Sequence, residues 1–273
     1  MIMNPFIYDI IACFVLGGIW VLLSSLAAQH FGGKIGGFIA GLPSTAVLAI
    51  FFITYTEGAR HGFDVASVFP LAISVNAVFL AAFAAFSSKS FSTGLMISLG
   101  IWVLIESVCM YFHPVRFGVI VTLGILLFLV SFFYISRLHI PDPGIRPVRH
   151  GMFDMFIRAV SGGSIIVLAM LGSRLGGPVL GGILSAFPGT VVATLIISDA
   201  YGGRDLTRVM ARPMMVSGVI NCMVFAFAYR HTVMHMHVIT ALTISYAITL
   251  VSAACTYYWL NIYHREHGHA IHT

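Results

Sequence analysis

Charged residues are scarce in this chain of 273 residues: Asp, Glu, Lys and Arg together make up 8% of it, whereas hydrophobic residues make up 59%. A soluble domain usually carries about 25% charged residues. Apolar stretches of about 20 residues recur along the whole length, and a helix needs about that length to cross the ~30 Å hydrocarbon core of a bilayer. The composition therefore excludes a soluble globular domain and predicts an all-α polytopic membrane protein.

Cysteine is scarce as well, and the motifs of common enzyme classes are missing. The four cysteines fall inside predicted spans, with no metal or redox spacing: Cys13, Cys109, Cys222 and Cys255. No P-loop, dinucleotide fingerprint, HExxH motif or nucleophile elbow occurs in a supporting context. The formal charge of +5 comes from scattered loop residues and not from a basic patch for nucleic acid. We therefore expect no enzyme, no cofactor, no metal and no nucleic-acid partner.

The apolar stretches predict about nine transmembrane helices. They lie at residues 5–28, 35–56, 64–87, 92–112, 115–136, 153–173, 178–199, 211–229 and 238–260. Between the fifth and the sixth lies SRLHIPDPGIRPVRHG, residues 136–151, whose prolines and arginines indicate a linker. Lys and Arg favour the loops on the linker side by about two to one. This bias predicts an N-terminus outside and a cytoplasmic C-terminus. The expected location is a bacterial inner membrane.

An internal repeat relates the two halves of the chain at a fixed separation of 145 residues. GGFIAGLPSTAV at residues 36–47 has its counterpart in GGILSAFPGTVV at residues 181–192. Further matches are Gly58 with Gly203 and Asn76 with Asn221. An odd number of spans separates the copies, so we expect two four-helix repeats of inverted topology, typical of secondary transporters. The predicted organisation is a first repeat at 1–113, a linking helix and linker at 114–151, a second repeat at 152–263 and a His-rich cytoplasmic tail at 264–273.

Each copy carries a proline inside an apolar helix, at Pro43 in the second span and at Pro188 in the seventh. Proline lacks an N–H group and clashes with the carbonyl four residues earlier, so both helices are predicted to break. Each proline lies roughly 12–15 Å into its span by helix rise, near the midplane. Helix ends freed there can bind a solute: their N-termini favour an anion, their C-terminal ends equally favour a cation, and the sequence does not decide between the two. The predicted substrate-binding residues are Gly41, Pro43, Ser44, Thr45, Asn76, Pro188, Gly189, Thr190 and Asn221.

Asn76 and Asn221 sit within the third and eighth spans, and two roles are open for them. A buried amide needs hydrogen-bond partners, which the broken backbone of a neighbouring helix or a substrate can supply. Glu106 in the fourth span is the clearest intramembrane acid, and such residues are functional candidates. It is the predicted site of proton coupling; the alternative is a carboxyl group hydrogen-bonded within the bundle.

The sequence GGILSAFPGTVVATLIISDAYGG, followed by RDLTRVMARPMMVSGVIN, resembles the GlpM-like family of small four-span bacterial membrane proteins. The resemblance implies a chain built from two fused units of that kind plus one further span, and it implies no substrate. His-rich segments at 231–237 and 264–273 can in principle bind copper or zinc. Because they fall on opposite sides of the predicted topology, we expect interfacial histidines and a polar tail instead.

These patterns favour a transporter of a small polar solute or anion that works by alternating access around the two broken helices. Two alternatives remain: a lipid-handling protein such as a flippase, and a channel of the same architecture. A groove that opens sideways to lipid between the halves favours lipid handling. The expected partners are a small-molecule solute and the lipid bilayer, with self-association left open.

Overall fold

A computed structural model describes residues 5–31, 43–112, 116–138, 140 and 151–268 of the chain, and all its regular structure in these residues is helical. The helices are α1 (Pro5–Phe31), α3 (Ser44–Glu57), α4 (Ala59–Phe86), α5 (Phe91–Phe112), α6 (Phe117–Arg137), α7 (Met152–Ser185), α8 (Gly189–Thr232) and α9 (Val238–Gly268). The prediction of an all-α protein is confirmed. Most of the linker predicted at 136–151 lies outside the described residues, and α9 extends into the predicted tail.

Six stretches of the described residues are long and apolar enough to cross a membrane. One of them, Met152–Thr232, contains three of the predicted spans, and the span predicted at 35–56 is represented by the 14 described residues of α3. The structure therefore supports an integral membrane protein. The number of nine spans stays a prediction.

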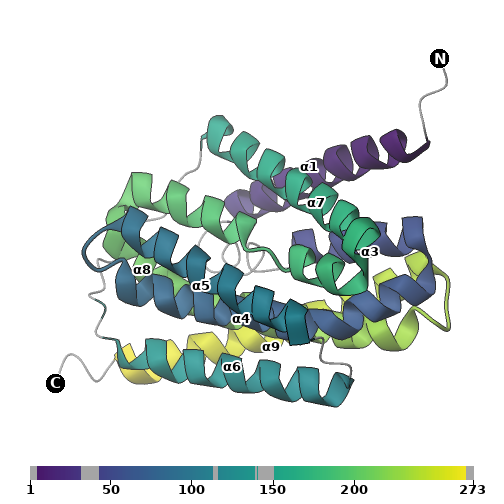
Figure 1. Ribbon diagram of the computed structural model, residues 1–273. Helices are drawn as coiled ribbons and strands as arrows, with labels where there is room; N and C mark the ends of the chain where they lie inside the picture. The colour runs from purple at the N-terminus through teal and green to yellow at the C-terminus, as the bar shows by residue number, and fades with distance from the viewer. Residues whose placement is uncertain (1–4, 32–42, 113–115, 139, 141–150, 269–273) are drawn as a thin grey trace.

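The bundle is built around α4, and the start of α1 and the end of α9 lie at its opposite ends (Figure 1). The most apolar window of α4 is 83% buried, whereas those of α5, α6 and α9 are between 17% and 22% buried. Helices α5 and α6 pack against α4, and α9 packs against α8. An apolar helix that leaves most of its surface outside the protein is suited to contact with lipid chains, which are themselves apolar.

Three glycines turn the chain sharply between helical segments. Gly58 joins α3 to α4 with φ 95° and ψ 164°, Gly177 lies within α7 with φ 74° and ψ −173°, and Gly203 lies within α8 with φ 73° and ψ 176°. This backbone region is essentially restricted to glycine. At Gly177 the helix folds back on itself, as the approach of Gly181 to Ser173 shows. A Cβ atom added to Gly181 would lie 2.6 Å from Ser173 Cβ, although the two residues are eight apart in the chain.

Prolines precede two of the helix starts. Pro43 directly precedes α3 and Pro188 directly precedes α8, with φ of −74° and −77°. The fixed φ of proline suits the entry to a helix, where its missing N–H group removes no hydrogen bond. The helical structure is interrupted between the end of α7 at Ser185 and the start of α8 at Gly189. The sequence predicted a break at this position.

Helices α1 and α7 run antiparallel and cross closely at paired glycines. A Cβ atom at Gly163 would lie 2.5 Å from the carbonyl oxygen of Phe14, and one at Gly18 would lie 3.2 Å from the carbonyl oxygen of Ala159. The two contacts are related by the 145-residue separation, since Gly18 corresponds to Gly163 and Phe14 to Ala159. Small residues on both helices allow this close backbone approach.

Candidate functional site

The interruption between α7 and α8 is closed by two side chains of other helices. Asn76 of α4 donates its Nδ2 hydrogen to the carbonyl oxygen of Ala186 over 2.9 Å. Its Oδ1 atom accepts a hydrogen bond of 2.8 Å from Trp102 Nε1 of α5. The Trp102 ring then meets the Phe187 ring edge-on, with centroids 5.3 Å apart. The bond to Ala186 is the kind expected if Asn76 satisfies broken backbone, and its contact with a substrate stays a prediction.

Asn221 lies at the level of Asn76 on the neighbouring helix. Helices α4 and α8 run antiparallel there. Ser74 Oγ donates to Met223 Sδ over 3.9 Å. Ser74 comes two residues before Asn76, and Met223 comes two residues after Asn221. Asn221 is fully buried. Its Oδ1 atom accepts a 2.9 Å hydrogen bond from Ser252 Oγ, but its Nδ2 atom has no partner among the described residues. One of the two paired asparagines thus keeps a donor unused.

The helix starts that follow the two prolines meet the same stretch of α7. A Cβ atom at Gly162 would lie 3.4 Å from Thr45 Cγ2, and one at Gly189 would lie 3.1 Å from Ile165 Cγ1. Gly162 and Ile165 are three residues apart, about 4.5 Å along the helix axis. Among the described residues, neither α3 nor α8 has a side-chain cap, and neither has an acidic residue in its first turn. The N–H group of Gly189 donates to the carbonyl oxygen of Phe187 over 2.9 Å. Two helix N-termini without a side-chain cap among the described residues therefore lie close together beside the crossing of α1 and α7.

The other predicted binding residues surround these helix starts. Pro43 and Pro188 are buried, whereas Ser44, Thr45, Gly189 and Thr190 are half-buried. The carbonyl oxygen of Thr190 accepts a 2.8 Å hydrogen bond from Thr194. Gly41 lies outside the described residues. The helix starts at Ser44 and Gly189 thus share one region of the fold.

Glu106 lies on the buried stripe of α5. This stripe repeats every four residues and consists of Gly94, Ser98, Trp102 and Glu106. Glu106 is 3% exposed, and neither of its carboxyl oxygens has a hydrogen-bond partner among the described residues. Its position is one helical turn beyond Trp102, which bonds Asn76. A buried carboxyl group without a partner is energetically costly, which favours a functional role over the predicted alternative of an internally bonded carboxyl.

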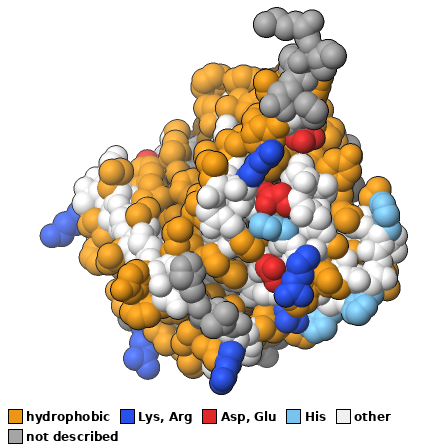
Figure 2. Space-filling view, turned by 45° about the vertical axis from the view of Figure 1, so that its right-hand side comes forward, with side chains coloured by type: hydrophobic (Ala, Val, Ile, Leu, Met, Phe, Trp, Pro, Cys, Tyr) orange, Lys and Arg blue, Asp and Glu red, His pale blue; other side chains and the backbone are white. Residues whose placement is uncertain are grey.

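A second polar cluster, absent from the sequence prediction, joins the α3–α4 turn to α7. His61 Nε2 lies 2.9 Å from both Glu57 Oε2 and Ser173 Oγ. A Ser–His–acid triad needs the acid and the serine on different ring nitrogens, so this cluster is not one. Figure 2 shows acidic, basic and histidine side chains gathered near the middle of one face, with hydrophobic side chains around them. The i,i+4 spacing of Glu57 and His61 was readable in the sequence; Ser173, more than 100 residues away, was not.

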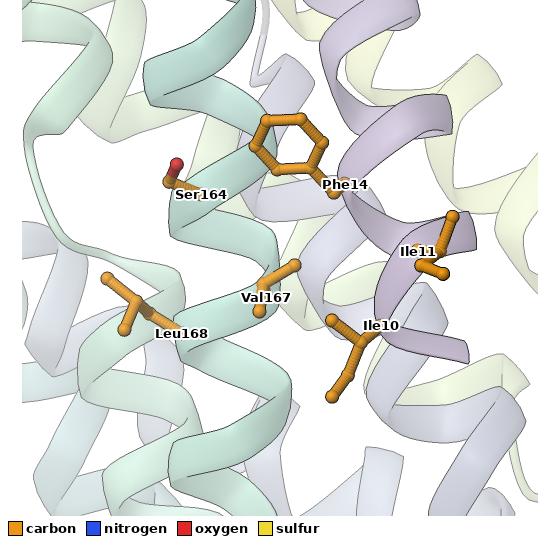
Figure 3. A pocket seen from close by; sticks show the side chains of 6 residues that line it. All are labelled: Ile10, Ile11, Phe14, Ser164, Val167 and Leu168. Atoms are coloured by element: carbon orange, nitrogen blue, oxygen red, sulfur yellow. The ribbon is translucent and has the colours of Figure 1, made fainter. Parts of the chain in front are cut away.

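A groove runs between α1 and α7 on the side of the bundle. Its volume is about 440 Å³. Ile10 and Phe14 of α1 and Val167 of α7 lie between the two helices (Figure 3), and Ile11, Ser164 and Leu168 complete the lining. A smaller cavity of about 100 Å³ lies beside it, lined by Ile165, Leu168, Leu184 and Phe187. Leu168 lines both, so the groove lies next to the interruption that Asn76 closes.

Comparison with known proteins gives one family match. Residues 10–116 match the model of a family described as a protein of unknown function, DUF3147. The match covers less than half of the chain, lies within its first half and ends close to the predicted boundary of the first repeat at residue 113. No curated protein and no solved structure matches the chain.

Proposed function

We propose that the chain consists of two repeats of inverted topology, with α6 between them. The helix bounds support this: α3 at Ser44–Glu57 corresponds to the part of α8 before Gly203, and Ser44 and Gly189 differ by 145. The turns at Gly58 and Gly203 have nearly the same backbone angles. The related contacts at the crossing of α1 and α7 are those expected around a twofold axis. The family match, which lies within the first half of the chain, also fits this organisation.

The function that this arrangement supports best is transport of a small polar solute or anion by alternating access. The observation that carries the proposal is the meeting of two uncapped helix starts, after Pro43 and Pro188, on one stretch of α7. Helix N-termini bind anions through free N–H groups and the helix dipole. The Nδ2 atom of Asn221, buried and without a partner among the described residues, would supply a further hydrogen bond to the solute. Glu106 would carry the coupling proton.

A flux measurement tests this proposal. The purified protein is first screened for thermal stabilisation by small carboxylates, phosphate and neutral polar solutes, because a ligand that binds the folded state raises the unfolding temperature. The stabilising solutes are then offered to proteoliposomes. We expect saturable uptake that a proton gradient accelerates. Single-channel currents without saturation would instead identify a channel, and the absence of both stabilisation and flux would contradict the proposal.

Lipid handling is the second candidate, because the groove between α1 and α7 opens sideways between the two halves, as expected of a lipid-handling protein. Transfer of a fluorescent phospholipid between leaflets of proteoliposomes would favour this candidate, provided that the solute screen is negative. The orientation, with the N-terminus outside and the C-terminus in the cytoplasm of a bacterial cell, is also a proposal. It is compatible with the start of α1 and the end of α9 at opposite ends of the bundle (Figure 1). The resemblance to the GlpM-like family stays a prediction.

A further inference from the structure

The groove between α1 and α7 has the shape of a slot for one lipid chain. At one end it is closed by the crossing of the two helices, where Gly163 meets the carbonyl oxygen of Phe14. Towards the start of α1 the helices are joined again where the guanidinium carbon of Arg174 lies 4.0 Å from the centre of the Phe6 ring. The lining residues of α1 run from Ile10 to Phe14, about 6 Å of helix rise, and Phe6 lies about 6 Å further towards the helix start. The groove and the contact beyond it together span about 12 Å, close to the ~15 Å of one leaflet of the hydrocarbon core.

The lining of the slot is apolar and open to the side of the bundle. Ile11 is 48% exposed, Phe14 38% and Leu168 52%, and all three belong to helices with membrane-spanning composition. Side chains of this kind in this position contact hydrocarbon chains and not water. The expected occupant of the slot is therefore an acyl chain.

A positive charge lies at the mouth of the slot. Arg174 is exposed, lies in the last turn of α7 before the reversal at Gly177, and has no carboxylate within 4 Å among the described residues. Basic residues near the membrane surface attract lipid phosphate. Asp9, the nearest acid along α1, is three residues from Phe6 and therefore on the same side of that helix, but no ion pair within 4 Å joins it to Arg174 among the described residues.

We propose that this slot is a phospholipid-binding site, with one acyl chain between α1 and α7 and the headgroup phosphate on Arg174. The occupant is a lipid of the leaflet that contains the start of α1. The site goes beyond the proposed transport function and does not depend on it. A lipid bound there lies next to Phe187 and the interruption of the α7–α8 chain, through the cavity that shares Leu168.

Photo-crosslinking measures occupancy of the slot directly. The full chain is reconstituted in nanodiscs that contain phosphatidylglycerol with a diazirine on one acyl chain, and the crosslinked peptides are mapped by mass spectrometry. We expect crosslinks concentrated on residues 10–14 and 164–168. Val167→Trp fills the slot and should remove most of these crosslinks. Val130 of α6 is 67% exposed, and Val130→Trp should leave the crosslinks unchanged.

Two further probes separate phosphate recognition from simple contact with lipid. Arg174→Gln should lower crosslinking of phosphatidylglycerol about fivefold, the effect of one basic residue at a lipid surface. It should leave a diazirine diacylglycerol, which has the same chains and no phosphate, unchanged. The control is Arg60→Gln, since Arg60 is exposed but lies 3.5 Å from Asp64.

Three outcomes would overturn the proposal. Crosslinks spread evenly over all lipid-facing helices would show that the slot is not selective. Equal crosslinking by Arg174→Gln and the wild type would show that no phosphate binds there. A slot without crosslinks in a protein that native mass spectrometry finds dimeric would show that a second copy covers it. Because Arg174 is exposed, Arg174→Gln should fold normally. This variant therefore still tests the proposal if Val167→Trp fails to fold.

Discussion

Asn76 and Ala186 are 110 residues apart in the chain, and the side chain of the first donates a 2.9 Å hydrogen bond to the backbone carbonyl of the second. Within a bilayer an unsatisfied carbonyl costs several kcal/mol. The interruption before α8 is therefore possible because α4 supplies a side-chain donor at that position. The same asparagine also accepts from Trp102, so one residue ties together α4, α5 and the end of α7.

Removal of this asparagine should destabilise the protein. Asn76→Leu leaves the Ala186 carbonyl and the Trp102 N–H without partners, which should cost about 2–4 kcal/mol of unfolding free energy. Asn221→Leu is the matched control. It removes only the bond from Ser252 and should cost about 1 kcal/mol. Unfolding in detergent measures both, and equal losses would contradict the role assigned to Asn76.

The turn glycines should tolerate no side chain. Gly58→Ala and Gly203→Ala place a Cβ atom on a backbone conformation that only glycine adopts readily, at a cost of about 1–3 kcal/mol each. A Cβ atom would meet nothing within 4 Å at either site, so the cost comes from the backbone alone. Gly100→Ala and Gly218→Ala are matched controls within helices, also with open space, and should be neutral or stabilising. Equal behaviour of turn and helix variants in thermal unfolding would refute the assignment.

The crossing of α1 and α7 should depend on its small residues. Gly163→Ala places a Cβ atom 2.5 Å from a backbone oxygen of α1, so the helices must separate. We expect a loss of about 1–3 kcal/mol. We also expect faster proteolysis or hydrogen exchange in α1 than in α4. If exchange in α1 is unchanged while the protein stays folded, the close crossing does not hold α1 in place.

The all-α fold class and the interruption at Pro188 were predictable from the sequence because they follow from local chemistry; the break predicted at Pro43 borders residues 32–42, which lie outside the described residues. Apolar length predicts helices, and a proline predicts an interruption wherever it falls. The partners across the bundle were not predictable in this way. Trp102 reads as an ordinary apolar residue of its span until Asn76 is placed beside it, and Ser173 is one of many small residues in α7. The hydrogen bonds of both depend on packing between distant helices, for which a single sequence carries no periodic signal.

Glu106 provides the test of proton coupling. Glu106→Gln removes a carboxyl group that has no hydrogen-bond partner among the described residues, so the unfolding free energy should be unchanged or higher. Uptake driven by a proton gradient should be lost, while exchange of solute at equal concentrations should remain. The control is Glu57→Gln, which removes a carboxylate 2.9 Å from His61 and should lower stability. Proton-driven uptake that survives in Glu106→Gln would remove this residue from the mechanism.

The most direct test of the account is the accessibility of the two helix starts. Single cysteines replace Thr45 and Thr190 in a background without the four native cysteines, and an impermeant thiol reagent is applied to each side of oriented vesicles. A site that alternates between the two sides predicts that both cysteines react from either side. It also predicts that a transported solute changes the labelling rates of both cysteines in the same direction. Cysteine at Ser131, buried in α6, should not react. If Thr45→Cys and Thr190→Cys both resist labelling from either side, the two helix starts do not form a transport site.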